Sequence, residues 1–245
     1  MNTTELIEKV KPCIVKIGVV IIENNTPRFI GAGSGFIISN SGHIITCSHV
    51  IKNLQVIHVG FDRGNFQLEY NLAKLVYDDH ERDFAIIKIE KQNLGFLPLG
   101  DFNSNNIGDE VIFLGFPLQV VKVTAHKGMI SAMGQDVLPK VNLNIFQIDG
   151  SVNNGNSGGP VVNKDGIVIG IVTSKYLEFN EELEKILKLG KMTGISIGSQ
   201  QGSIDIGESF FNIVNLMRSH INVGIGHAFS IEYAKSFLSE QKLIV

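Results

Sequence analysis

The sequence lacks tryptophan and has only six prolines and two cysteines among its 245 residues. Two cysteines are too few for a disulfide framework, so Cys13 and Cys47 are expected to be free thiols. The 21 basic residues do not exceed the 24 acidic ones, which argues against nucleic acid as a main partner. No uninterrupted run of 18 apolar residues occurs, which argues against a membrane span. An ordinary soluble globular protein is expected.

The N-terminal segment lacks the apolar core of a secretory leader. Residues 1–11 mix charged side chains with three apolar ones, Leu6, Ile7 and Val10. Together with the two free thiols, this pattern predicts a reducing, cytoplasmic location. The sequence contains no feature that specifies an oligomer, although it is compatible with one.

Short segments rich in valine and isoleucine, separated by glycine and asparagine, predict an all-β protein. Six strands are expected before residue 96, at 14–22, 35–38, 43–46, 56–61, 68–76 and 84–90. A second run is expected at 111–115, 120–125, 127–132, 145–148, 160–162 and 167–172, with a returning strand at 223–229. The chain therefore reads as two consecutive β units.

Four helices are expected besides these strands. A short amphipathic helix is expected before Pro12, and a C-terminal helix is expected to bury Tyr233, Ala234, Phe237 and Leu238. Residues 175–222 interrupt the strand rhythm, and apolar spacing predicts helices at 180–189 and 208–220. These helices have two interpretations: they dock on the β units, or they bind a partner.

A serine set among glycines, Gly155-Asn156-Ser157-Gly158-Gly159-Pro160, is the most informative segment. Glycine allows a backbone conformation in which successive N–H groups point to one place, beside the serine hydroxyl. The alternative interpretation of such a segment is a simple turn.

A base and an acidic partner for that serine occur earlier in the chain. His49 follows an apolar strand, and Asp83 begins another one, where an unpaired carboxylate would be costly. The order His49, Asp83, Ser157 is the order of a chymotrypsin-like catalytic triad.

These segments resemble the trypsin-like peptidases of the HtrA/Deg type. The resemblance rests on Gly33–Ile38, Ile45–Ile51, Arg82–Lys88, Gly155–Pro160 and Gly224–Phe229, and it extends from about Lys11 to Phe229 apart from the insertion. It implies two perpendicular six-stranded antiparallel β-barrels, with the triad between them. It also implies hydrolysis of peptide bonds in protein or peptide substrates, without a metal or cofactor.

Carried over residue by residue, the resemblance makes Ser157 the nucleophile, His49 the base and Asp83 the group that orients the histidine. The N–H groups of Gly155, Asn156 and Ser157 would line the oxyanion hole.

The resemblance also implies a set of substrate-binding residues, among which no carboxylate is placed to attract Lys or Arg. A small or medium aliphatic side chain before the cut is therefore expected. His227 has two interpretations, a hydrogen bond to a substrate Gln or Glu and a packed ring that faces away. The substrate-binding residues implied are Val152, Thr173, Ser174, Gly226 and His227.

The expected organisation is a single protease domain in two halves. Residues 1–100 hold the N-terminal helix and the first barrel, and residues 101–245 hold the second barrel, the insertion 175–222 and the C-terminal helix. The PDZ domain that commonly follows this peptidase is not expected after Val245. The insertion either replaces regulation found elsewhere in the family or pads the barrel.

Two other functions remain open at this stage. One is a scaffold on a protease fold, which a regulatory protein activates through the insertion. The other is a hydrolase of esters or small acyl compounds, which would leave intact protein uncut.

Overall fold

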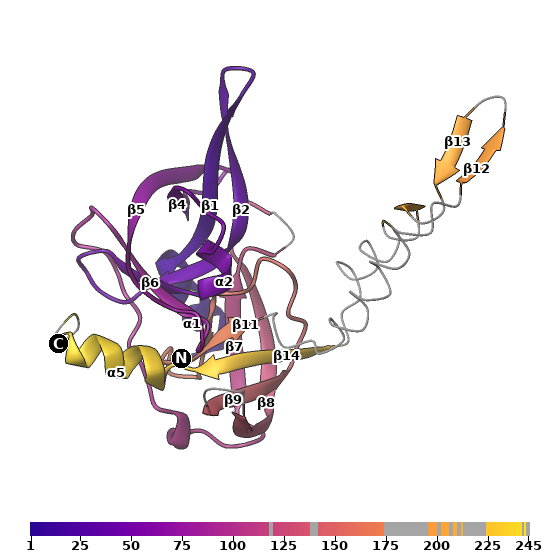
Figure 1. Cartoon of the computed structure of the whole chain (residues 1–245). Coiled ribbons are helices and arrows are strands. Elements are labelled where there is room, and N and C mark those ends of the chain that lie inside the picture. Colours follow the sequence, from indigo (N-terminus) through magenta and orange to yellow (C-terminus); the bar gives the residue numbers. More distant parts are fainter. Residues whose placement is uncertain are drawn as a thin grey trace. The chain divides into compact units, whose positions relative to one another are not determined.

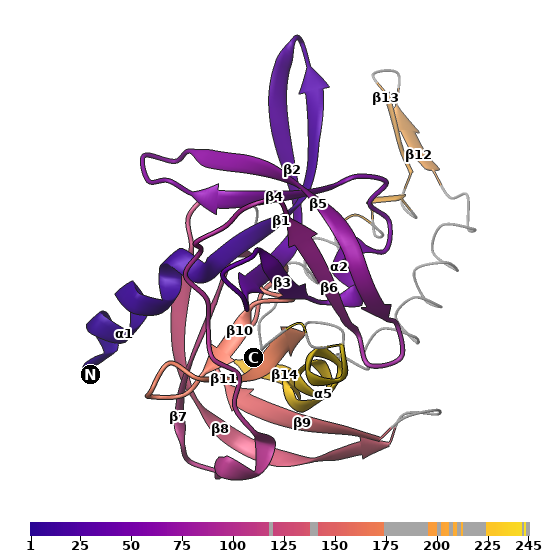
Figure 2. The ribbon, with the colours of Figure 1, turned by 90° about the vertical axis from the view of Figure 1, so that its left-hand side faces the viewer.

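The structure is a computed structural model that describes residues 1–117, 120–137, 142–173, 196–199, 202–205, 208–209, 212, 224–241 and 243. Two closed six-stranded antiparallel barrels form its body, and Figures 1 and 2 show them stacked on one another. The expected all-β fold with two such barrels is confirmed.

The first barrel closes in the order β1-β2-β3-β6-β5-β4. Its strands are β1 Ile14–Glu23, β2 Thr26–Ile37, β3 His43–Thr46, β4 Ile57–Asp62, β5 Leu68–Asp79 and β6 Phe84–Ile89. β2 begins nine residues earlier than expected, because β1 and β2 form a long hairpin, Glu23 pairing with Thr26. Asn24 and Asn25 at its tip have φ of 50° and 59°, the left-handed conformation that a tight hairpin turn needs and asparagine tolerates.

The second barrel closes in the order β10-β11-β14-β9-β8-β7. Its strands are β7 Glu110–Gly115, β8 Thr124–Val137, β9 Asn142–Asp149, β10 Pro160–Val162, β11 Val168–Thr173 and β14 Ile225–Ser230. The strands expected at 120–125 and 127–132 were wrong as separate elements, since β8 contains the whole of 127–132 and the last two residues of 120–125. β8 pairs with β7 up to Met129 and with β9 from Met129 onward, so one long strand serves two neighbours.

The short helices are α1 Thr3–Val10, α2 Ser48–Ile51 and α5 Glu232–Glu240, with 3₁₀ turns η1 Lys11–Cys13 and η2 Phe102–Ser104. Ala234 and Leu238 of α5 are fully buried, and Tyr233 and Phe237 pack against the same core. The expected buried side of the C-terminal helix is therefore confirmed. Within the described residues, no helix is long and apolar enough to span a membrane.

Each terminal helix contacts the barrel that is distant from it in sequence. A Cβ atom on Gly166, in the turn between β10 and β11, would lie 3.1 Å from Leu6 of α1. At the other end, the Phe237 ring of α5 stacks on Tyr77 of β5 with centroids 3.7 Å apart. The division of the chain at residue 100 stays a prediction, and the packing of both helices crosses it.

Residues Lys175–Val223 form a compact unit separate from the rest of the chain. It contains a hairpin that the sequence pattern does not predict, β12 Ser196–Ser199 paired with β13 Gly202–Asp205. Glu208, Ser209 and Asn212 have helical backbone. The helix expected at 180–189 lies outside the described residues, as does most of the helix expected at 208–220.

Candidate active site

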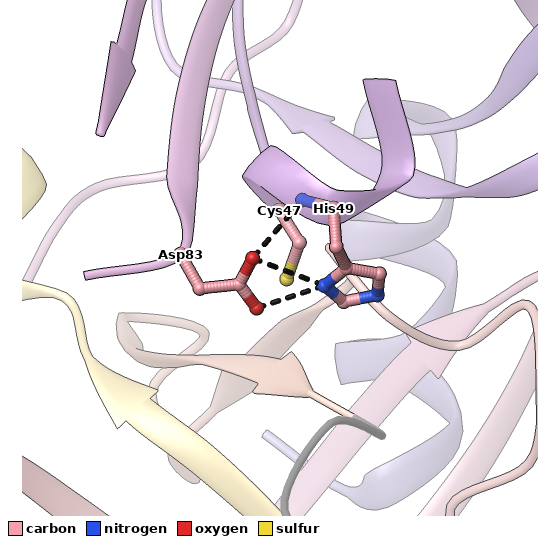
Figure 3. Close-up of side chains that lie close together, drawn as sticks. All are labelled: Cys47, His49 and Asp83. Carbon is pink, nitrogen blue, oxygen red and sulfur yellow. Dashed lines mark hydrogen bonds and ion pairs between the residues drawn. The ribbon is translucent and has the colours of Figure 1, made fainter. Parts of the chain in front are cut away.

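A buried carboxylate holds a histidine at the edge of the first barrel. His49 lies on α2, directly after β3, and Asp83 immediately precedes β6. His49 Nδ1 lies 2.8 Å from Asp83 Oδ2 and 3.1 Å from Oδ1, and the His49 backbone N–H donates to Oδ1 at 3.0 Å (Figure 3). The fold therefore brings together His49 and Asp83, two of the three residues predicted to be catalytic.

Asp83 is almost completely buried, and its carboxylate is satisfied from several sides. Besides the two groups of His49, the hydroxyl of Thr173 donates to Oδ2 at 3.4 Å. The backbone of Asp83 has φ of 54°, a left-handed conformation that is uncommon for a residue with a side chain. Its own carbonyl accepts from the Ser48 N–H at 3.3 Å, so the strained residue is held at both ends.

This pairing decides which nitrogen of His49 is available. A carboxylate only accepts hydrogen bonds, so Nδ1 carries the hydrogen and Nε2 has the lone pair. Figure 3 shows Nε2 on the side of the ring away from Asp83. The side chain of His49 is 29% exposed, so this edge of the ring can meet another group. The arrangement suits a general base.

Ser157 is the second residue of the second of two consecutive tight turns. The Asn156 N–H donates to Asn153 O at 3.0 Å, and the Gly159 N–H donates to Asn156 O at 2.9 Å. The third residue of each turn is a glycine with positive φ, 99° at Gly155 and 86° at Gly158. A turn with positive φ at this position favours glycine, which explains the glycines on either side of the serine.

The loop that carries Ser157 rests on the first barrel close to His49. The Ser34 N–H of β2 donates to Ser157 O at 2.8 Å. A Cβ atom on Gly158 would lie 2.5 Å from Thr46 Oγ1 and 3.0 Å from Cys47 N, just before His49 in the chain. The loop that carries Ser157 therefore contacts the first barrel just before His49.

The three predicted oxyanion-hole donors are not equivalent. The Asn156 N–H donates within its turn, to Asn153 O at 3.0 Å, so in this structure it is not available to an oxyanion. In the described structure, the Gly155 N–H makes no hydrogen bond. Gly155 and Ser157 stay the predicted donors.

The predicted substrate-binding residues do not all lie together. A Cβ atom on Gly226 would lie 2.4 Å from Val152 Cγ2, so these two residues are in contact. His227 faces the opposite side of β14, because successive side chains alternate and Ala228, like Gly226, is buried, with Ala228 in the barrel core. Thr173 is buried and turns its hydroxyl to Asp83. Ser174 lies outside the described residues.

Cys47 lies beside the His49–Asp83 pair. Its Sγ donates to Val172 O at 3.3 Å, and the side chain is completely buried. One ligand atom each from Cys47, His49 and Asp83 lie within 4.8 Å of one another, so these residues are a set that could hold a metal ion (Figure 3). The 2.8 Å between His49 Nδ1 and Asp83 Oδ2 is that of a direct hydrogen bond.

A family model matches more than half of the chain. The model for the trypsin-like peptidase domain matches residues 33–171, which include His49, Asp83 and Ser157. The chain belongs to this family. The resemblance to HtrA-type peptidases is also confirmed by similar sequences and structures.

Two relatives are named probable periplasmic serine endoprotease DegP-like. The one from Rickettsia prowazekii is 40% identical over 156 residues, covering 62% of this chain and 29% of its own length. The one from Rickettsia conorii is 38% identical over 176 residues, covering 69% of this chain and 34% of its own length. This peptidase domain thus spans about a third of the relatives that it matches.

A solved structure with the same fold is the HtrA-type protease AlgW with a decapeptide. It has a TM-score of 0.69 and 22% sequence identity, and the match covers 98% of this chain and 67% of that one. At this identity the likeness concerns the fold.

The predicted cytoplasmic location was wrong. The relatives of this peptidase domain from Rickettsia and from Chlamydia muridarum are named periplasmic. The prediction rested on residues 1–11 and on the two free thiols. Both are weaker indicators of the cellular compartment than the names of the relatives.

Two residues near the site make contacts that the sequence did not predict. Thr173 was expected to meet substrate, but its hydroxyl contacts Asp83. Ser34, in the Gly33-Ser34-Gly35 motif, contacts the loop that carries Ser157. The motif is visible in the sequence. Ser157, which Ser34 contacts, is 123 residues away along the chain, and no local pattern indicates a contact over that separation.

Gly158→Ala is expected to destabilise the protein more than Gly64→Ala. Both glycines have positive φ, so an alanine costs about 1–2 kcal/mol in strain at either position. A Cβ at position 158 would also lie 2.2 Å from Ser34 O, whereas nothing lies within 4 Å at position 64. Urea unfolding of the two variants measures the difference. Equal losses would contradict the close contact between Gly158 and the first barrel.

Proposed function

We propose that this chain is a serine endopeptidase in which Ser157 is the nucleophile, His49 the general base and Asp83 the residue that orients His49. The observation that carries the proposal is the His49–Asp83 pair, 2.8 Å between Nδ1 and Oδ2, next to the loop of Ser157. Membership of the trypsin-like peptidase family supports it. So do the relatives, which are named serine endoproteases.

In the first half of the proposed reaction, Ser157 Oγ attacks the carbonyl carbon of the scissile peptide bond, and His49 Nε2 takes the hydroxyl proton. The negative charge that develops on the carbonyl oxygen is stabilised by the Gly155 and Ser157 N–H groups. His49 then gives the proton to the leaving amine, and an acyl-enzyme remains.

In the second half, water attacks the acyl carbon and His49 takes its proton. The tetrahedral intermediate collapses, the proton returns to Ser157 Oγ, and the carboxylic acid product leaves. Throughout, the Asp83 carboxylate holds the Nδ1–H of His49 and stabilises the imidazolium that forms twice per turnover. The three donors that bond the Asp83 carboxylate hold it in this orientation.

Protein or peptide substrates in the periplasm fit this proposal, because the relatives are named periplasmic endoproteases. Thr173 is proposed to contact the substrate through its main chain, since its hydroxyl is turned to Asp83.

A fluorophosphonate is expected to label Ser157, and casein is expected to be cut. Ser157→Ala should lose both labelling and about 10⁶-fold in kcat, because the nucleophile is absent. Asp83→Asn should lose about 10⁴-fold in kcat, because it allows the wrong tautomer of His49. Intact mass, a peptide map and casein hydrolysis measure these effects.

Ser209→Ala is a suitable control for this test, because Ser209 lies in the separate unit 175–223. It should be labelled at Ser157 like the wild type. A folded wild-type chain that is not labelled would contradict the proposal. Ester hydrolysis without any casein cleavage would favour a hydrolase of small acyl compounds.

The proposed preference before the cut is a small or medium aliphatic side chain. Val152 contacts Gly226, so the space between them is already narrowed by a valine, and neither residue carries charge. We expect peptides with Ala or Val before the cut to be cleaved faster than those with Lys or Phe. Val152→Ala should shift the preference toward larger side chains by about tenfold. Mass spectrometry of a cleaved peptide library measures this, and an unchanged preference would exclude Val152 from the pocket.

A second candidate function is a protease that a partner activates through the insertion. It is favoured by the compactness of Lys175–Val223 as a unit of its own. Thr173 pairs with His227, so the two ends of the insertion can be joined by a short turn without disturbing β11 and β14. This pairing makes the candidate testable.

A chain with residues 175–223 replaced by a short Asn-Gly linker is expected to fold and to react with fluorophosphonate at Ser157 as fast as the full chain. The physical reason is that the described contacts of the site lie within one unit. Circular dichroism and labelling rates measure this. Loss of labelling in a folded shortened chain would favour the partner-activated alternative.

A further inference from the structure

Ser34 is a fully buried serine of the first barrel whose polar groups all contact other parts of the site. Its N–H donates to Ser157 O at 2.8 Å, and its hydroxyl donates to Gly155 O at 2.6 Å. The same hydroxyl accepts from the Phe116 N–H at 2.9 Å, and the Ser34 carbonyl accepts from Thr46 Oγ1 at 2.7 Å. One residue thus joins two loops of the second barrel to two strands of the first.

Two of these hydrogen bonds set the direction of peptide groups in the nucleophile loop. The C=O and N–H of a trans peptide group point in opposite directions. Because Gly155 O points to Ser34, the Asn156 N–H points away and meets Asn153 O at 3.0 Å. Because Ser157 O points to Ser34, the Gly158 N–H points away and meets Val172 O at 2.9 Å. Ser34 therefore orients the peptide groups on both sides of the Asn156–Ser157 bond.

The direction of the Asn156–Ser157 peptide group is set by the second turn, residues 156–159. Asn156 O accepts from the Gly159 N–H at 2.9 Å, so the Ser157 N–H points out of this turn, in the opposite direction. Ser157 N–H is one of the two proposed oxyanion donors. Its direction depends on a turn that Ser34 holds on both sides.

The side chain of Asn156 does not share this task. It is completely buried, and within the described residues neither its Oδ1 nor its Nδ2 has a hydrogen-bond partner. A Cβ atom on Gly115 would lie 2.9 Å from Asn156 Oδ1 and 2.8 Å from Ser34 Oγ, so the two polar groups are close to each other. Of these two, the Ser34 hydroxyl is the one that binds the backbone of the loop.

The remaining contact of Ser34 extends to the base. Thr46, which donates to the Ser34 carbonyl, ends β3, and His49 follows three residues later on α2. The distance between nucleophile and base is set across two barrels, and Ser34 contacts the chain on both sides of that gap.

We infer that Ser34 is a positioning residue, which holds the oxyanion donors and Ser157 in the geometry that the reaction needs. This inference rests on the proposed function. It predicts that the Ser34 hydroxyl acts on the transition state and not on substrate binding, because it contacts the loop backbone from the buried side.

Ser34→Ala removes the hydroxyl and keeps the backbone N–H that binds Ser157 O. We expect kcat to fall about 10²-fold with KM unchanged, since a small misplacement of reacting groups has an effect of this size. A peptide boronic acid, which mimics the tetrahedral intermediate, should bind more weakly by a similar factor. The product peptide acid should bind equally to both proteins. Peptide hydrolysis and calorimetry measure these quantities.

Ser230→Ala is the matched control. Ser230 is equally buried, and its hydroxyl accepts from the Glu232 N–H at the start of α5. A general loss of stability would affect both variants, whereas only Ser34→Ala should separate boronic acid binding from product binding. If Ser34→Ala lowers kcat no more than Ser230→Ala, the inference is overturned while the proposed function stands. A folded wild-type chain without activity overturns the proposed function and this inference with it.

Ser34→Cys covers the case in which the alanine variant does not fold. It keeps the shape of the side chain, but a thiol is a weak donor and a weak acceptor. Thermal unfolding establishes that it is folded at the assay temperature. A reduced kcat with unchanged KM supports the inference, and a kcat equal to that of the wild type overturns it.

Discussion

The contact between the loop that carries Ser157 and the first barrel is the constraint on which the rest of the site depends. His49 and Asp83 belong to the first barrel and Ser157 to the second, so no local structure sets their spacing. The hydrogen bond from the Ser34 N–H to Ser157 O, 2.8 Å long, crosses between the barrels at this point. Because Gly158 has no side chain, the backbone of its loop can approach the backbone of the first barrel at Ser34 and Cys47. A proton transfer between serine and histidine needs this degree of order.

The site collects several conformations that are costly elsewhere in the chain. Asp83 has positive φ and a buried carboxylate, Gly155 and Gly158 have positive φ, and the buried amide of Asn156 has no partner among the described residues. Such features persist where the surrounding structure holds them. Here that structure is a hydrophobic core which continues from the first barrel into β7, β10 and β11 and under α5. Strain at the site and cohesion between the barrels are thus linked.

The sequence predicted the fold class well, since the period of the apolar residues records which segments are strands. It was less successful where pairing decides the length of a strand. β2 is longer than expected because the β1–β2 hairpin extends beyond the apolar segment, and β8 is one strand because it pairs with two neighbours. The hairpin of β12 and β13 was missed, since Ser196–Ser199 and Gly202–Asp205 have little apolar alternation.

The sequence by itself determined the types and order of the reactive residues, because a serine between glycines, a histidine after a strand and an aspartate before one are local patterns. Only the tertiary structure decided which groups are available. It directed the Asn156 N–H to Asn153 and the Thr173 hydroxyl to Asp83. It also placed His227 and Gly226 on opposite faces of β14 and connected Ser34 to the loop that carries Ser157. Each of these depends on hydrogen bonds or strand faces whose partners form only when the barrels close, and such contacts leave no periodic signal in the chain.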